Sequence, residues 1–142
     1  MEFMGVNLLS VLVAAIATMI LGFLWYSPIL FAKPWTAAMG YDLNDKAKMD
    51  EMRKGAGKLY GITFVASLLS AFVLAKIIDV TTVTSALYGM KTGFAVWLGF
   101  VTTVQLTSTL FKKRPIKLYL IDTGYQLVCY LVMGVILAKW PR

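Results

Sequence analysis

The chain has 142 residues, of which 59% are hydrophobic and only 15% are charged, and its formal net charge at pH 7 is +7. Soluble domains are about 45–50% apolar and about 25% charged, so the composition excludes an ordinary soluble domain and predicts one membrane domain over residues 1–142. With no histidine and a single cysteine, Cys129, the chain cannot form a Ser-His-Asp set, an internal disulfide or a thiolate zinc site.

The seven acidic residues show no calcium-loop spacing, and most of them lie in one polar segment. We therefore expect no bound metal and no cofactor. No carboxylate stands near an activated nucleophile in the sequence, so we also expect no enzymatic activity.

Four apolar runs are long enough to cross a membrane, which takes roughly 20 residues of helix. They cover residues 6–27, 59–78, 86–111 and 118–140. The sequence therefore predicts an all-α fold, a bundle of four transmembrane helices whose short connections make neighbouring helices antiparallel.

The first span ends in an aromatic turn, Trp25-Tyr26-Ser27-Pro28, and Trp35 follows it. Pro28 has no amide hydrogen and would end or kink the helix, while the aromatic side chains would anchor the turn at the interface. We interpret these residues as an interfacial elbow, with a binding site as the alternative.

The polar segment 32–58 is predicted to be partly helical and to lie on the membrane surface. Asp42 or Asn44 is a plausible cap for a short helix, and Gly55-Ala56-Gly57 is expected to stop that helix before the second span.

Small residues recur every four positions, as expected where membrane helices pack closely. The first span has Ser10, Ala14, Thr18 and Gly22, the second has Thr63, Ser67, Ala71 and Ala75, and the third has Gly89 and Gly93, then Gly99, Thr103 and Thr107. The first two sets predict a tight pair of helices. Packing within one bundle and self-association between copies both remain open for these residues.

Asp122 is the main ionisable group at membrane depth, and such groups are functional candidates. Gln126 lies one turn deeper on the same helix, and Gln105, with Thr102, Ser108 and Thr109 nearby, reaches a similar depth on the third span. We expect Asp122 to accept hydrogen bonds from Gln126, Gln105 or a threonine. Three interpretations stay open: a structural polar clasp between the third and fourth helices, part of a solute, ion or proton pathway, and a hydrated carboxylate near the interface.

Ten of the 14 Lys and Arg residues lie in the loops after the first and third spans. Such loops face the cytoplasm, which predicts an inner-membrane protein with both termini outside the cytoplasm. The two basic loops would bind anionic lipid headgroups in the bilayer. Their short length and the lack of interleaved base-stacking aromatics argue against nucleic acid.

Several segments together resemble a known family. They are Gly22 to Phe31 with Trp35, Trp97-Leu98-Gly99-Phe100, Pro115 to Leu118, Ile121 to Tyr125, and Gly134 to Leu137 with Trp140. Their order is similar to that in the domain of unknown function 1761, a family of small, mainly bacterial membrane proteins. The resemblance implies a four-helix integral membrane protein and no established activity.

Two hypotheses for function follow. The first is a homo-oligomer whose third and fourth helices form a pathway for a small solute or ion, with Asp122, Gln126, Gln105 and Thr102 on its wall. The second is a structural or accessory subunit that binds another protein in a larger membrane complex.

Overall fold

The computed structural model describes residues 2–3, 5–27, 30–38 and 46–140. Within them, four helical segments are long and apolar enough to cross a membrane: Leu8–Trp25, Gly57–Val80, Ala86–Phe111 and Ile116–Lys139. The predicted all-α architecture of four spans is confirmed.

The elements follow one another along the chain with short connections. They are β1 (Glu2–Phe3), β2 (Val6–Asn7), α1 (Leu8–Trp25), α2 (Ala32–Ala38), α3 (Lys46–Val80), α4 (Ala86–Val96), the π-helix η1 (Trp97–Val101), α5 (Thr102–Phe111) and α6 (Ile116–Lys139). The third span is the continuous run of α4, η1 and α5. The two strands form only a short antiparallel hairpin before α1.

α1 begins at a side-chain cap and ends in the predicted aromatic turn. The Asn7 carboxamide oxygen accepts a hydrogen bond from the Leu9 amide at 2.9 Å, which satisfies one of the free amides of the first turn. The helix ends at Trp25, and the Tyr26 amide still donates to the Gly22 carbonyl at 3.0 Å. Pro28 lies outside the described residues.

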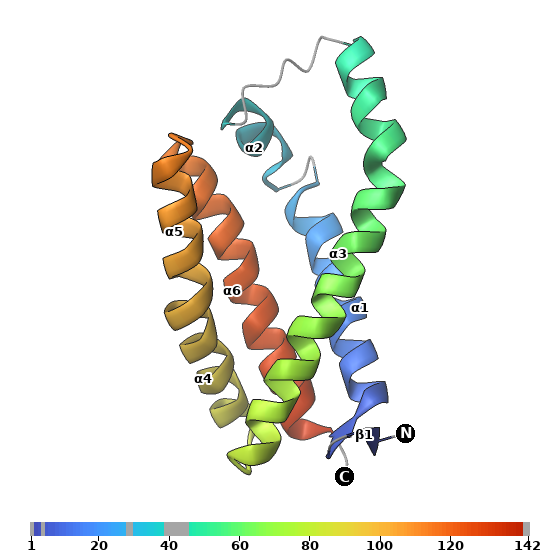
Figure 1. Cartoon of the computed structure of the whole chain (residues 1–142), viewed down its shortest axis with the longest axis vertical. Helices are drawn as coiled ribbons and strands as arrows, with labels where there is room; N and C mark the ends of the chain where they lie inside the picture. The colour runs from blue at the N-terminus through green and yellow to red at the C-terminus, as the bar shows by residue number, and fades with distance from the viewer. Residues whose placement is uncertain (1, 4, 28–29, 39–45, 141–142) are drawn as a thin grey trace.

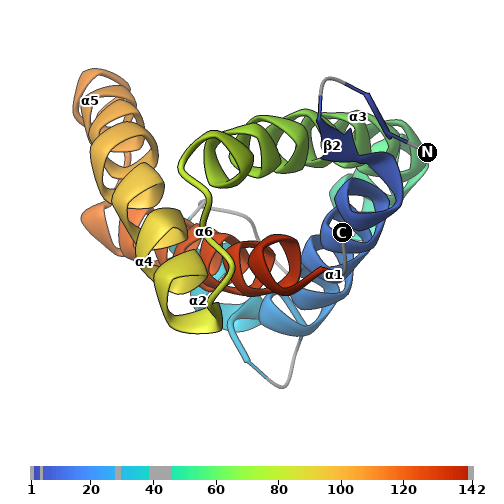
Figure 2. The same ribbon diagram turned by 90° about the horizontal axis from the view of Figure 1, so that it is seen from below.

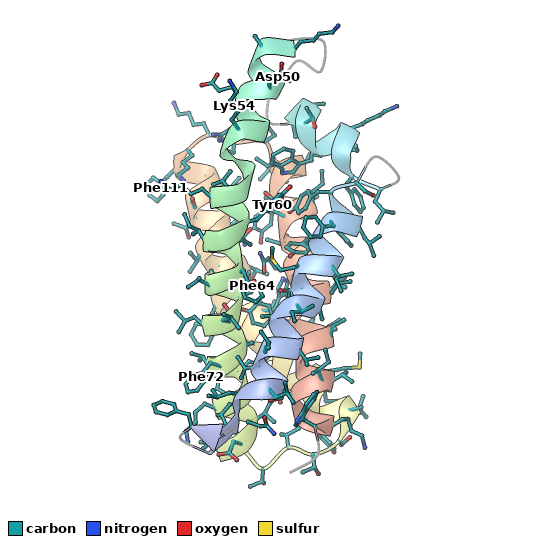
Figure 3. All side chains as sticks on the ribbon, turned by 90° about the vertical axis from the view of Figure 1, so that its right-hand side faces the viewer. Asp50, Lys54, Tyr60, Phe64, Phe72 and Phe111 are labelled. Carbon is teal, nitrogen blue, oxygen red and sulfur yellow. The ribbon has the colours of Figure 1, made fainter. Side chains whose placement is uncertain are left out.

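The predicted stop at Gly55-Ala56-Gly57 is wrong, because α3 runs through these residues without a break. A glycine inside a helix costs about 1 kcal/mol, whereas a break would leave four amides and four carbonyls without helical partners. Asp50 and Lys54 lie on the part of α3 that extends beyond the ends of the other membrane-spanning helices, and Tyr60 lies lower on α3 (Figure 3). Asp42 and Asn44, the expected caps, lie outside the described residues.

α6 is the central helix and packs against α1, α3 and α4. Its closest neighbour is α4, where glycines allow the two backbones to touch. A Cβ atom on Gly89 would overlap the Gly134 carbonyl, and one on Gly93 would overlap the Tyr130 carbonyl. The third span lies at the edge of the bundle beside α6 (Figure 2).

The small residues of α1 are shared between two neighbouring helices. Ala14 of α1 and Ala71 of α3 are fully buried in one core cluster. Gly22, however, faces α6, since a Cβ atom there would lie 3.0 Å from the Tyr125 hydroxyl. Along α3, Ser67 is half-buried and Thr63 is exposed, so the small residues of α3 pack closely on α1 only near the terminal end of the span. At the other end the contact between the two helices includes the rings of Phe23 and Tyr60, 5.4 Å apart.

Both termini lie at one end of the bundle, and α2, the start of α3 and the turn between α5 and α6 lie at the other end (Figure 1). The two basic loops predicted from the sequence are therefore at the same end of the molecule. We call this the loop end and the opposite one the terminal end.

Candidate functional site

Asp122, on the second turn of α6, is bound by the aromatic turn that follows α1. The Tyr26 hydroxyl donates a hydrogen bond to its carboxylate at 2.6 Å, and the Trp35 side chain forms a second one. The predicted elbow and the predicted intramembrane carboxylate are therefore parts of one site. We call Trp25, Tyr26, Trp35, Asp122 and Tyr125 the Asp122 cluster.

The Tyr26 ring packs edge to face on two other rings of the Asp122 cluster. The Tyr26 ring lies 5.8 Å from the Trp35 ring and 5.4 Å from the Tyr125 ring, with interplanar angles of 72° and 64°. Such aromatic pairs stabilise a fold more than the burial of their apolar surface alone would. The Tyr125 hydroxyl in turn donates to the Thr18 carbonyl of α1 at 2.8 Å. These contacts join the end of α1 to the first half of α6.

Two tryptophans hold the backbone on either side of Asp122. The Trp25 indole donates to the Ile121 carbonyl at 3.1 Å, and the Trp97 indole donates to the Thr123 carbonyl at 2.8 Å. Gly124 leaves room for Trp25, since a Cβ atom there would lie 3.2 Å from its ring. Trp97 begins the π-helical segment of the third span, and single π turns are frequent at functional sites.

The state of the Tyr26 hydroxyl follows from its surroundings. Burial, and then the hydrogen bond to Asp122, raise the pKa of Tyr26 well above its ordinary value of 10.0. A tyrosine hydroxyl is protonated at neutral pH, and the raised pKa keeps Tyr26 the donor to the carboxylate at alkaline pH as well.

A polar groove of about 250 Å³ opens between α5 and α6 at the loop end. Its lining residues are Gln105, Ser108, Thr109, Lys112, Arg114, Leu118, Tyr119 and Asp122. We call it the α5–α6 groove. Two cationic side chains come from the connecting turn, and the single carboxylate comes from within the span, so the groove contains both signs of charge.

Gln126 lines a different cavity, which lies between α1, α3 and α6. This α1–α3–α6 cavity has a volume of about 130 Å³ and is lined by Thr18, Thr63, Ala66, Ser67, Ser70, Tyr125, Gln126, Cys129, Tyr130 and Met133. The structure therefore brings Asp122, Gln105 and Thr109 together but places Gln126 elsewhere.

Thr102 is outside the lining of both spaces. Its hydroxyl donates to the Leu98 carbonyl at 2.6 Å, and its own carbonyl accepts from the Tyr119 hydroxyl at 3.3 Å. Among the residues that the structure describes, the hydrogen-bond donors to Asp122 are Tyr26 and Trp35 rather than the expected glutamines and threonines, so Asp122 joins α6 to the segment after α1 and not to the third span.

Sequence reasoning missed Tyr125 and the role of Trp97. A signal for Trp97 was present, because it is a tryptophan far from the interfaces, where an indole N–H needs an acceptor. The signal for Tyr125 was weaker, because a tyrosine that directly follows a glycine does not by itself indicate a functional side chain. In the part of the chain that the structure describes, no three acidic or cysteine side chains are grouped as metal ligands would be.

Residues 9–138 match the family described as "Protein of unknown function (DUF1761)". No curated protein and no solved structure matches the chain.

Proposed function

Because this chain belongs to the DUF1761 family, whose function is unknown, we propose a function from its own geometry: a pathway for a small polar solute or ion across the membrane. Its four apolar helices are those of a membrane protein. With no histidine in the chain, we propose transport rather than catalysis.

The observation that carries the proposal is a series of three spaces along α6, each lined in part by polar side chains. The α5–α6 groove includes Asp122, the α1–α3–α6 cavity includes Gln126, and a third space of about 40 Å³ at the terminal end includes Leu137. Asn7, Ser10 and Asp79 supply polar atoms to that third space. Polar groups at membrane depth are expensive and mark solute or ion routes.

Two barriers separate these spaces in the proposed pathway. Tyr26 is hydrogen-bonded to Asp122 of the groove and packs on Tyr125, which lines the α1–α3–α6 cavity, so we assign the first barrier to these two rings. The buried apolar residues Ala14, Ala71 and Leu74 stand between that cavity and the terminal end. The pathway is therefore closed in this conformation, and transport requires both barriers to open in turn.

We propose that the protein works as a homo-oligomer. The third span packs almost wholly on α6, so the outer side of the α5–α6 groove is left open by the described residues of the chain. A helix of a second copy would cover that side and separate the groove from lipid. The same open side also favours a second candidate function, an accessory subunit whose third span binds a different membrane protein.

We propose an orientation with the loop end in the cytoplasm and both termini outside, in a bacterial inner membrane. Lys and Arg are concentrated at the loop end, as the positive-inside rule requires. Anionic lipid headgroups would bind there.

The test is permeability. Purified protein in liposomes is exposed to gradients of glycerol, urea and potassium chloride, and the change in liposome volume is followed by stopped-flow light scattering. We expect faster equilibration than in empty liposomes for at least one of the three, and a rate lowered roughly tenfold by Asp122→Asn, the equivalent of about 1.4 kcal/mol.

Asp50→Asn is the matched control, because Asp50 lies on the part of α3 beyond the bundle (Figure 3). It should equilibrate like the wild type. Wild-type liposomes no more permeable than empty ones, or an Asp122→Asn variant identical to the wild type, would refute the proposal.

A further inference from the structure

The charges of the α5–α6 groove are separated along its length. Lys112 and Arg114 belong to the connecting turn at the loop end, whereas Asp122 lies six residues after Ile116, the first residue of α6. At 1.5 Å per residue, this places Asp122 about 9 Å deeper along the helix. The groove therefore has a positive mouth and a negative inner end.

Asp122 has acceptor capacity left for a ligand. A carboxylate has about four lone-pair sites, and Tyr26 and Trp35 use two of them. These donors come from the chain that follows α1, while the same carboxylate also lines the groove. The two hydrogen bonds fix the carboxylate in place, so that its remaining sites are held ready for a cationic donor in the groove.

Neutral polar side chains lie between the two charged ends. Gln105, Ser108 and Thr109 supply an amide and two hydroxyls to the lining. The groove has a volume of about 250 Å³ and is open on one side, so it has room for a small polar molecule that lies along it.

We propose that the α5–α6 groove binds a small zwitterion, with its ammonium group at Asp122 and its phosphate group at Lys112 and Arg114. A simple anion would be repelled by Asp122, and a simple cation would be repelled at the mouth, so complementary charge selects a molecule that has both. This inference names the substrate class of the proposed pathway and rests on that proposal. An aminoalkyl phosphate has the required chemistry, either as a free solute or as the headgroup of an ethanolamine lipid.

The binding test uses O-phosphoethanolamine as the probe. It is titrated by calorimetry into the full chain, purified in dodecyl maltoside without added lipid. We expect saturable binding to the wild type. Asp122→Asn removes the partner of the ammonium group and Lys112→Gln removes one partner of the phosphate, so each should raise the Kd roughly tenfold or more.

The variants also test the orientation of the ligand, which has its ammonium group at Asp122 and its phosphate group at the mouth. Methyl phosphate lacks the ammonium group, so Lys112→Gln should weaken its binding, whereas Asp122→Asn should leave it equal or tighter. Lys54→Gln, on the part of α3 beyond the bundle, is the control for a change of surface charge and should bind both probes like the wild type (Figure 3). Lys112 is exposed, so its substitution does not depend on the folding of the Asp122 cluster.

Adding phosphatidylethanolamine to the micelles distinguishes the two sources of the ligand, a lipid headgroup and a free solute. Competition with the free probe supports the lipid headgroup, and undiminished binding supports the free solute. No binding of the probe to the wild type, or equal binding to all variants, would overturn the inference. Binding without any solute flux would refute the pathway and leave the zwitterion site standing, whereas flux of glycerol or urea without zwitterion binding would refute the site alone.

Discussion

Asp122 is held by donors that come from a distant part of the chain. Tyr26 lies 96 residues before it in the sequence, yet its hydroxyl donates to the carboxylate at 2.6 Å. The indoles of Trp25 and Trp97 hold the carbonyls on either side. Because the carboxylate is only partly exposed, the loss of one donor removes a hydrogen bond to a half-buried charge, which is costly.

We predict that Tyr26→Phe lowers the free energy of unfolding by about 1–3 kcal/mol, since the ring remains and only the donor is lost. Unfolding in mixed detergent micelles, titrated with dodecyl sulfate and followed by circular dichroism, measures this change. Tyr60→Phe is the control: Tyr60 is half exposed and its ring packs on Phe23 at 5.4 Å. Its effect should stay within about 0.5 kcal/mol. Equal effects of the two substitutions would contradict the role given to Tyr26.

The members of the Asp122 cluster were partly predictable from the sequence, but their association was not. An aspartate inside an apolar run and tryptophans at the end of a span stand out by residue type alone. Their meeting depends on how α1 crosses α6, and no local pattern reports a contact between residues so far apart in the chain. Gln105 and Asp122 could be matched by depth, since a short turn joins their antiparallel helices.

Close packing of α4 on α6 depends on glycines that face each other. Gly89 and Gly134 approach so closely that a Cβ atom on either would overlap the backbone of the other. Lipid is as apolar as leucine, so the packing gained by this approach is a main source of attraction between the two helices.

We predict that Gly134→Ala forces α4 and α6 apart and lowers the free energy of unfolding by about 1–3 kcal/mol, the usual cost of overpacking. Gly99→Ala, in the same hairpin, meets no atom within 4 Å and should be neutral or slightly stabilising. The same detergent titration compares the two variants. A Gly134→Ala protein as stable as Gly99→Ala would show that the helices do not touch there.

The spans were predictable because about 20 consecutive apolar residues have few alternatives to a membrane helix. The length of α3 was not predictable from local signals, since Gly55 and Gly57 resemble a helix stop and only the continuous backbone hydrogen bonding overrides them. Gly134 was missed as a packing residue although a signal was present, because Gly134 and Ala138 stand four residues apart and both lie against Gly89.

At the scale of the whole molecule, the basic loops share one end and the termini share the other (Figure 1). We predict that the loop end is cytoplasmic. Cys129 is the only cysteine and is buried, so a Cys129→Ala background allows single cysteines to be labelled. Thr84 is exposed in the connection between α3 and α4, at the terminal end. A membrane-impermeant maleimide should label Thr84→Cys in intact cells and Lys54→Cys only after permeabilisation. The reverse pattern would contradict the orientation.

The proposal that the protein forms a homo-oligomer depends on the open side of the α5–α6 groove. Along the third span, Leu98, Phe100 and Val104 are more than half exposed. A second copy packed there would separate the groove from lipid and leave a polar route along α6. Both the proposed pathway and the zwitterion site place their ligand in this groove.

Native mass spectrometry of the protein released gently from its own membrane tests the homo-oligomeric pathway most directly. We predict a closed homo-oligomer, and the loss of any retained small zwitterion in Asp122→Asn. A monomer, or a fixed complex with a different protein, would contradict the account and assign the function to that partner.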